Sequence, residues 1–176
     1  MLKRLNQPIT ANKVLVIADC EHDFTQRLPQ WLNIESNQLL VLSSTNASVT
    51  QPYGCLVRNI ILAIYEKGID QIYLIAPEEQ ASPTFNQQIL LNKFENDGID
   101  QELIDTLEYS RIINKDVLTW LKGPDGDVDD VLKSSVTLLE NHPLIPKRVI
   151  IEAFTVNTIT GHFTSISSKK TEEDIC

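Results

Sequence analysis

Three short apolar segments in the first half of the chain restrict its fold more than any other feature. They are "KVLVIAD" (13–19), "QLLVLSS" (38–44) and "DQIYLIAP" (70–77). Each is a continuous run of branched and apolar residues, which is typical of a strand buried on both faces. Such strands belong to parallel sheets covered by helices on both sides, so we predict three buried strands of that kind.

Segments with helical periodicity separate and follow these strands. The clearest is "GCLVRNIILAIYEKG" (54–68), in which Gly68 is well placed to end the helix in a left-handed conformation. Its apolar residues recur at helical spacing and form one stripe, made of Val57, Ile60, Ile61 and Ile64. A short helix is predicted over 26–33, and an amphipathic helix over 85–97.

The second half of the chain continues the alternation. We predict short helical pieces over 99–122 and a helix over 127–142 with acidic residues in its first turn. A long strand over 148–157 then returns as an antiparallel edge strand over 162–166. The whole pattern predicts an α/β fold with a mostly parallel central sheet, flanked by helices. We predict that residues 1–12 form a short N-terminal arm, 13–166 an α/β domain, and 167–176 a flexible tail.

Composition excludes several classes of function. The 176 residues are 42% apolar and carry a net charge of −9, which fits a soluble globular protein and disfavours nucleic acid or an anionic membrane as a partner. No apolar run is long enough for a membrane span, and we expect no secretion signal in the first residues, which lack an apolar stretch. The three cysteines form no CxxC pair, so we expect a cytoplasmic protein with reduced thiols, two buried and one in the tail.

The candidate site lies where the first predicted strand ends. Parallel sheets place their sites at the carboxyl ends of the strands, and "DCEHD" brings three carboxylates, a thiol and an imidazole to that position. These residues are Asp19, Cys20, Glu21, His22 and Asp23. The acids can be solvated charges on a strand-end loop. Alternatively, Cys20 and His22 are two zinc ligands that need a third from Cys55 or an acid.

Two longer stretches resemble the β-class carbonic anhydrases. "TNASVTQPYGCLVRNIILAIYEKGIDQIYLI" (45–75) is similar to the middle of that family, where a loop leads into a helix with an arginine, here Arg58. "WLKGPDGDVDDVLKSSVTLLENHPLIPKRVIIEAFTVNTITGHFTSI" (120–166) is similar to its end, through "HPLIP" and the "TG" turn. With 13–42 as the first two strands, the resemblance covers about 13–166. It implies a β-carbonic anhydrase-like fold and a homodimer or higher homo-oligomer.

The family's first zinc motif is Cys-x-Asp-x-Arg at the end of the first strand. Zinc activates a water molecule there, so that hydroxide attacks carbon dioxide. Matched without a gap, this motif falls on Asp19, Glu21 and Asp23. Shifted by one residue, it falls on Cys20, His22 and Phe24. The first register loses the thiolate and the arginine, and the second keeps the thiolate but loses the Asp–Arg pair.

The second zinc motif, His-x-x-Cys at the end of the third strand, falls on Pro77 and Gln80. Proline has no side-chain donor atom, and glutamine is a poor zinc ligand. At least two of the three protein ligands are therefore missing in either register. A full ligand set binds zinc with about 10–16 kcal/mol, which one carboxylate or thiolate cannot approach.

The sequence therefore predicts a catalytically inactive, zinc-free member of this family with a binding, sensing or regulatory role. A small-molecule ligand at the former pocket or an active paralogue is the expected partner. The pocket would be vestigial and lined by Asp19, Cys20, Glu21, His22, Asp23, Arg58, Pro77 and Gln80. The alternative is a carbonic anhydrase-like metalloenzyme with a rebuilt zinc site around Cys20 and His22.

Overall fold

The computed structural model describes residues 13–19, 24–78, 86–110, 116–124 and 126–166. Its contacts divide the chain into two compact units. The first comprises residues 1–79 and 126–176, and the second comprises 80–125. The boundaries of the predicted arm and tail fall outside the described residues, so that part of the domain division stays a prediction.

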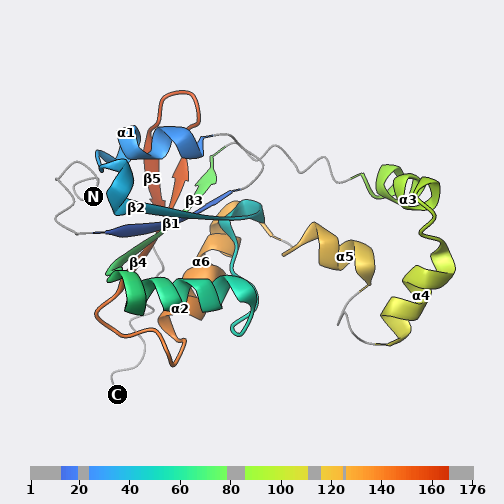
Figure 1. Ribbon diagram of the computed structural model, residues 1–176. Helices are drawn as coiled ribbons and strands as arrows, with labels where there is room; N and C mark the ends of the chain where they lie inside the picture. Colours follow the sequence, from blue (N-terminus) through green and yellow to red (C-terminus); the bar gives the residue numbers. More distant parts are fainter. Residues whose placement is uncertain (1–12, 20–23, 79–85, 111–115, 125, 167–176) are drawn as a thin grey trace, which may run out of the picture. The chain divides into compact units, whose positions relative to one another are not determined.

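A five-stranded sheet forms the centre of the first unit (Figure 1). Its strand order is β2-β1-β3-β4-β5. Neighbours among the first four are parallel, whereas β4 and β5 are antiparallel. The strands are β1 (Val14–Asp19), β2 (Leu39–Ser44), β3 (Gln71–Pro77), β4 (Ile150–Val156) and β5 (Phe163–Ile166). The predicted α/β fold with one antiparallel edge strand is confirmed.

Helices cover both faces of this sheet. On one face α2 (Cys55–Lys67) and α6 (Val128–Glu140) pack against alternate residues of the central strands, among them Leu15 and Leu74. On the other face α1 (Leu28–Leu32) packs with an aromatic cluster that includes Phe154. The connections that the structure describes include the short 3-10 turns η1 (Thr25–Arg27), η2 (Ser36–Gln38) and η3 (Thr45–Ala47).

Helix α2 forms as its sequence pattern predicts. Val57, Ile60 and Ile64 from the predicted stripe are buried, whereas Ile61 is half-buried. Gly68 follows the last turn with φ 70°, a conformation that costs glycine no Cβ clash. The helix therefore begins and ends close to the predicted bounds.

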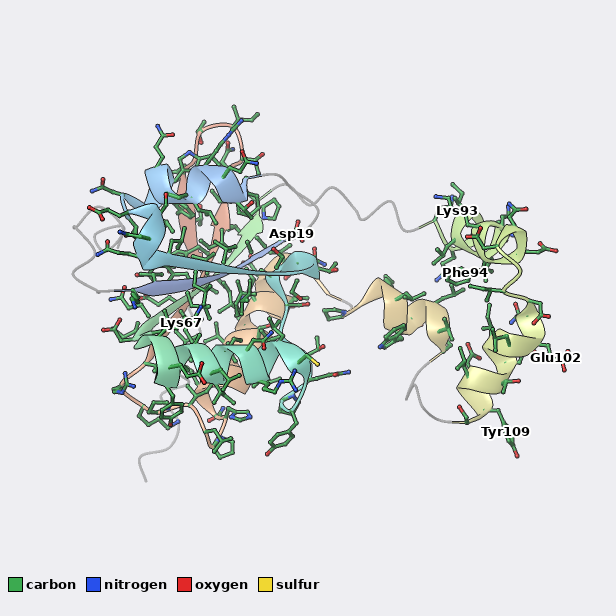
Figure 2. The ribbon with its side chains drawn as sticks, viewed as in Figure 1. Asp19, Lys67, Lys93, Phe94, Glu102 and Tyr109 are labelled. Carbon is green, nitrogen blue, oxygen red and sulfur yellow. The ribbon has the colours of Figure 1, made fainter. Side chains whose placement is uncertain are left out.

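The second unit consists of α3 (Gln87–Asn96), α4 (Gln101–Tyr109) and α5 (Val117–Lys122). Each helix begins with an Asn or Asp side chain that accepts a hydrogen bond from a backbone N–H in its first turn. Among its described residues only Ile104 and Val117 are buried apolar side chains. Figure 2 labels Lys93 and Phe94 on α3 and Glu102 and Tyr109 on α4.

Two expectations are wrong in detail. β2 was expected to be buried on both faces, but it is an edge strand, and Leu39, Leu40, Val41 and Leu42 are only half-buried. Strand order depends on the whole sheet, which an apolar run does not encode. Cys55 was expected to be buried, but it is exposed at the first residue of α2, where the helix turns its other side to the core.

Candidate functional site

The carboxyl ends of β1, β2 and β3 lie at one edge of the sheet, where α/β proteins place their sites. Asp19 is the last residue of β1 and lies beside Ser44, the last residue of β2. Pro77 is the last residue of β3 and lies beside Val156 of β4. Parallel pairing thus brings Asp19 and Pro77, which the sequence places at strand ends, to the same edge of the sheet.

Asp19 is a buried carboxylate at this edge, with 2% of its surface exposed. Its Oδ1 accepts a hydrogen bond of 2.7 Å from the backbone N–H of Asn46 in η3. Asn46 has a left-handed backbone with φ 54°, a conformation that asparagine tolerates better than most residues. Figure 2 labels Asp19 at the end of β1. The carboxylate thus holds the loop after β2 against the end of β1.

The same loop is fixed by hydroxyl groups. Ser44 Oγ donates to the carbonyl of Ser48 over 2.7 Å, and Ser48 Oγ donates to the carbonyl of Thr45 over 2.7 Å. The N–H of Val49 donates to Ser135 Oγ over 2.9 Å, which ties the loop to α6. The hydroxyl groups of Ser44, Ser48 and Ser135 therefore form hydrogen bonds with backbone groups of the loop.

Pro77 and Glu78 end β3. Pro77 is buried and has no side-chain donor or acceptor atom. The N–H of Glu78 donates to the carbonyl of Val156 over 2.8 Å, so the backbone remains paired with β4 just beyond Pro77, while the Glu78 side chain is exposed. The described end of β3 therefore offers no imidazole or thiolate.

The other predicted pocket residues are placed as follows. Arg58 is exposed in the first turns of α2, as is Cys55. Cys20, Glu21, His22, Asp23 and Gln80 lie outside the described residues. The vestigial pocket as a complete set of residues stays a prediction.

The described residues do not supply a zinc site. Within the parts of the chain that the structure describes, no group of three or more His, Cys, Asp or Glu side chains is close enough to hold a metal ion. At the sheet edge they contribute one buried carboxylate, that of Asp19, and a proline side chain without ligand atoms. Zinc sites in proteins use three or four Cys, His or carboxylate ligands, so this described donor set does not fit zinc.

His142 lies just after α6 and has a structural environment. It is buried, and its Nε2 lies 2.9 Å from the carbonyl oxygen of Pro52. The N–H of Leu144 donates to its Nδ1 over 3.2 Å, so Nε2 is the atom that donates to Pro52. The "HPLIP" segment is thereby fastened to the loop before α2. His162 is exposed in the turn before β5.

Two groups that hold the site loop were not found from the sequence. The backbone N–H of Asn46 and the Ser135 hydroxyl are ordinary groups without a distinguishing motif. Asn46 does lie in the "TNAS" segment that opens the resemblance to the middle of the carbonic anhydrases, and this is the one signal that could have directed attention to it.

Comparison with known sequences gives relatives named as carbonic anhydrases, although no protein-family profile matches the chain. The Bacillus subtilis (strain 168) protein named "Putative carbonic anhydrase YtiB" is 28% identical over 149 residues, which cover 85% of this chain and 78% of that protein. "Putative carbonic anhydrase YvdA" of the same organism is 28% identical over 151 residues, covering 85% of this chain and 75% of that protein.

Comparison with solved structures gives the same fold. The β-carbonic anhydrase isoform I of Trichomonas vaginalis matches with a TM-score of 0.71 and 18% identity, covering 88% of this chain and 82% of that one. The apo form of a carbon disulfide hydrolase matches with a TM-score of 0.67 and 21% identity, covering 94% and 84% of the two chains.

The fold is therefore that of the β-carbonic anhydrases: a mostly parallel five-stranded sheet with one antiparallel edge pair, flanked by helices. The sequence relatives are named as putative carbonic anhydrases, and the chain is similar to them over most of its length. No helix in the described parts of the chain is long and apolar enough to cross a membrane.

Proposed function

We propose that this chain is a zinc-free, catalytically inactive carbonic anhydrase-like protein with a binding, sensing or regulatory role. The observation that carries the proposal is the end of β3. Pro77 lies there, buried and with its backbone paired to β4, at the position that the resemblance assigns to a zinc-binding histidine. A proline cannot acquire a ligand atom by a change of rotamer, so this ligand is lost whatever the neighbouring residues do.

The environment of Asp19 supports the same conclusion. In the ungapped register Asp19 stands where the family has its first thiolate, and its Oδ1 accepts the N–H of Asn46. A carboxylate oxygen that satisfies a buried backbone donor has a structural use, because an unpaired buried N–H costs about 1–3 kcal/mol. Without a metal nothing in this donor set would lower the pKa of a bound water molecule to the range that carbon dioxide hydration needs.

We further propose that the protein is a cytoplasmic homo-oligomer whose partner is a small ligand or an active paralogue. One structural neighbour is described as a tetrameric β-carbonic anhydrase from Sordaria macrospora, with a TM-score of 0.53. That neighbour shares the fold, and the net charge of −9 is compatible with a soluble protein.

Stopped-flow measurement of carbon dioxide hydration tests the proposal. The full chain, purified without chelators and then exposed to zinc, should hydrate carbon dioxide no faster than buffer with the same free zinc. A zinc-dependent hydration rate that falls in Cys20→Ala or His22→Ala would instead favour the alternative, an enzyme with a rebuilt metal site.

A variant with the family's ligands provides the positive control. Asp19→Cys, Pro77→His and Gln80→Cys together restore two thiolates and one imidazole at the ungapped motif positions. If this triple variant binds zinc while the natural chain does not, the frame has kept its geometry and only the ligands are missing. Far-UV circular dichroism of both proteins checks that the substitutions leave the fold intact.

A further inference from the structure

We propose that the outer side of α2, together with the loop that leads into β4, is a docking surface for an acidic peptide segment of a partner protein. This α2 surface comprises residues 48–67 and 141–149. The inference rests on the binding role proposed above and gives it a second surface and a class of partner. It does not depend on the loss of zinc, because none of these residues lies at the sheet edge that holds Asp19 and Pro77.

The α2 surface exposes four large apolar side chains. Between 46% and 80% of their surface is in contact with water, and they are Leu62, Leu144, Tyr65 and Tyr53. Among the described residues of the first unit, the other exposed side chains of this kind are Ile150, which follows the surface at the start of β4, and Ile159. Single exposed apolar residues are ordinary in soluble proteins, whereas a contiguous group of them marks an interaction site.

Printed contacts hold these side chains in one area. Tyr65 Oη donates a hydrogen bond of 3.2 Å to the carbonyl of Leu144. The ring of Tyr53 lies against the ring of His142, with centroids 5.4 Å apart. The segment after α6 therefore lies alongside α2, from the loop before the helix to its last turn, and the exposed side chains of the two segments form one surface.

Helix α2 has an exposed stripe in addition to its buried one. Arg58, Leu62 and Tyr65 recur at helical spacing and are all exposed, whereas Val57 and Ile60 are buried against the sheet. The solvent side of a helix in a globular protein normally carries charged and polar residues. A stripe of one arginine, one leucine and one tyrosine has instead the composition of a protein interface, where aromatic residues and arginine are enriched.

The α2 surface is basic, although the chain as a whole is acidic. It contains four exposed basic residues and one exposed acidic residue: Arg58, Lys67, Lys147, Arg148 and Glu66. Because the chain has 15 basic and 24 acidic residues, 11 basic and 23 acidic residues remain elsewhere, with a net charge of −12. Glu140 borders the surface, and its carbonyl accepts a hydrogen bond from Lys147 Nζ. Electrostatic complementarity therefore favours an acidic partner.

A short acidic segment fits this surface better than a polyanion or a second copy does. A nucleic acid or an anionic membrane extends beyond the α2 surface and meets the negative charge of the other residues. A short segment interacts mainly with charges within a Debye length, about 8 Å at physiological salt. Two copies that met through this surface across a two-fold axis would set basic residues against basic residues.

Two kinds of variant separate the apolar and the charged contributions. The double variant Leu62→Ser/Leu144→Ser removes two exposed apolar side chains and keeps the backbone carbonyl that Tyr65 contacts. Ile159→Ser is its control, since Ile159 is exposed in the turn before β5. Arg148→Glu reverses one charge of the surface, and Lys122→Glu makes the same change in net charge at an exposed position of α5.

The probe is a random peptide library displayed on phage and selected on the full natural chain. We expect the enriched peptides to place acidic residues beside apolar ones. A fluorescein-labelled peptide of the enriched sequence then gives Kd by fluorescence anisotropy. The double variant and Arg148→Glu should each raise Kd at least about tenfold, and both controls should leave it within about twofold. The Kd of the natural chain should rise with salt concentration.

Three results would overturn the inference. If no peptide is enriched relative to selection on the double variant, or if the enriched peptides lack acidic residues, the surface has no acidic partner. If the peptide binds the double variant and Arg148→Glu as tightly as the natural chain, it docks elsewhere. If sedimentation equilibrium shows that the natural chain self-associates and the double variant does not, the surface is a contact between copies. The zinc content of the same preparation is measured separately, so a failure of the zinc-free proposal is distinguished from a failure of this one.

Discussion

Replacement of Gly161 by alanine should destabilise the first unit through an unfavourable backbone conformation and one close contact. Gly161 ends the turn between β4 and β5 with φ 73°. A Cβ built there would lie 2.5 Å from Trp31 Nε1 and 2.7 Å from Trp31 Cδ1. The indole has little freedom to withdraw, because it stacks on Phe24 and meets Phe163 edge-on, each with ring centroids 6.3 Å apart.

The expected loss has two parts. A non-glycine residue in the left-handed region costs roughly 1–2 kcal/mol, and inserting a methyl group into a packed cluster costs about 1–3 kcal/mol. Gly161→Ala should therefore lower the free energy of unfolding by about 2–5 kcal/mol. For a chain of this size each kcal/mol corresponds to a decrease in Tm of about 2–4 °C. Urea denaturation followed by circular dichroism measures the loss directly.

Gly68→Ala is the matched control. Gly68 has nearly the same backbone, φ 70°, but a Cβ there would meet nothing within 4 Å. It should show only the conformational part of the loss, so Gly161→Ala should be the more damaging change by about 1–3 kcal/mol. In a Trp31→Leu background that excess should disappear. Equal losses for the two glycines in the natural background would refute the assignment of the contact to Trp31.

Two other changes test the loop and the second unit. Ser135→Ala should lower the free energy of unfolding by about 1–3 kcal/mol, because the buried N–H of Val49 loses its acceptor. The control Ser134→Ala, on the exposed side of α6, should change the free energy of unfolding by less than about 0.5 kcal/mol. Equal effects of the two variants in urea denaturation would contradict the hydrogen bond between Val49 and Ser135. The hydrogen bonds from Thr119 lower the pKa of the Asp116 carboxyl group, which caps α5. The stability that this cap contributes should therefore be present above the unfolded-state pKa and be lost as pH falls through the folded-state pKa. NMR titration of the Asp116 carboxyl carbon should give a midpoint below that of the unfolded chain, and a midpoint at or above it would be inconsistent with the cap.

The sequence predicted the elements whose signals are local. A continuous apolar run predicts β1, and an apolar stripe that ends at Gly68 predicts α2. In both cases the residues of the element itself indicate which side chains are buried. β2 has a similar apolar run, but its place at the edge depends on strand order. The exposed Cys55 shows the same limit, because its residue type favours burial and only the docking of α2 decides otherwise.

The sequence predicts where the candidate site lies, but it does not predict the hydrogen bonds that hold the loop there. Parallel strands bring their carboxyl ends together, so placing Asp19 and Pro77 at one sheet edge required only the strand assignments. Asp19 accepts a hydrogen bond from the backbone of Asn46, 27 residues away, and the N–H of Val49 donates to Ser135, 86 residues away. Such distant bonds between common groups leave no spacing pattern in the sequence.

The most direct test of the central claim is the zinc content of the purified chain. The protein is purified without chelators, incubated with excess zinc, and separated from unbound metal by gel filtration. Its zinc content is then measured by inductively coupled plasma mass spectrometry. The triple variant Asp19→Cys, Pro77→His and Gln80→Cys is the positive control. We expect no stoichiometric zinc in the natural chain. One tightly bound zinc ion per chain would contradict it.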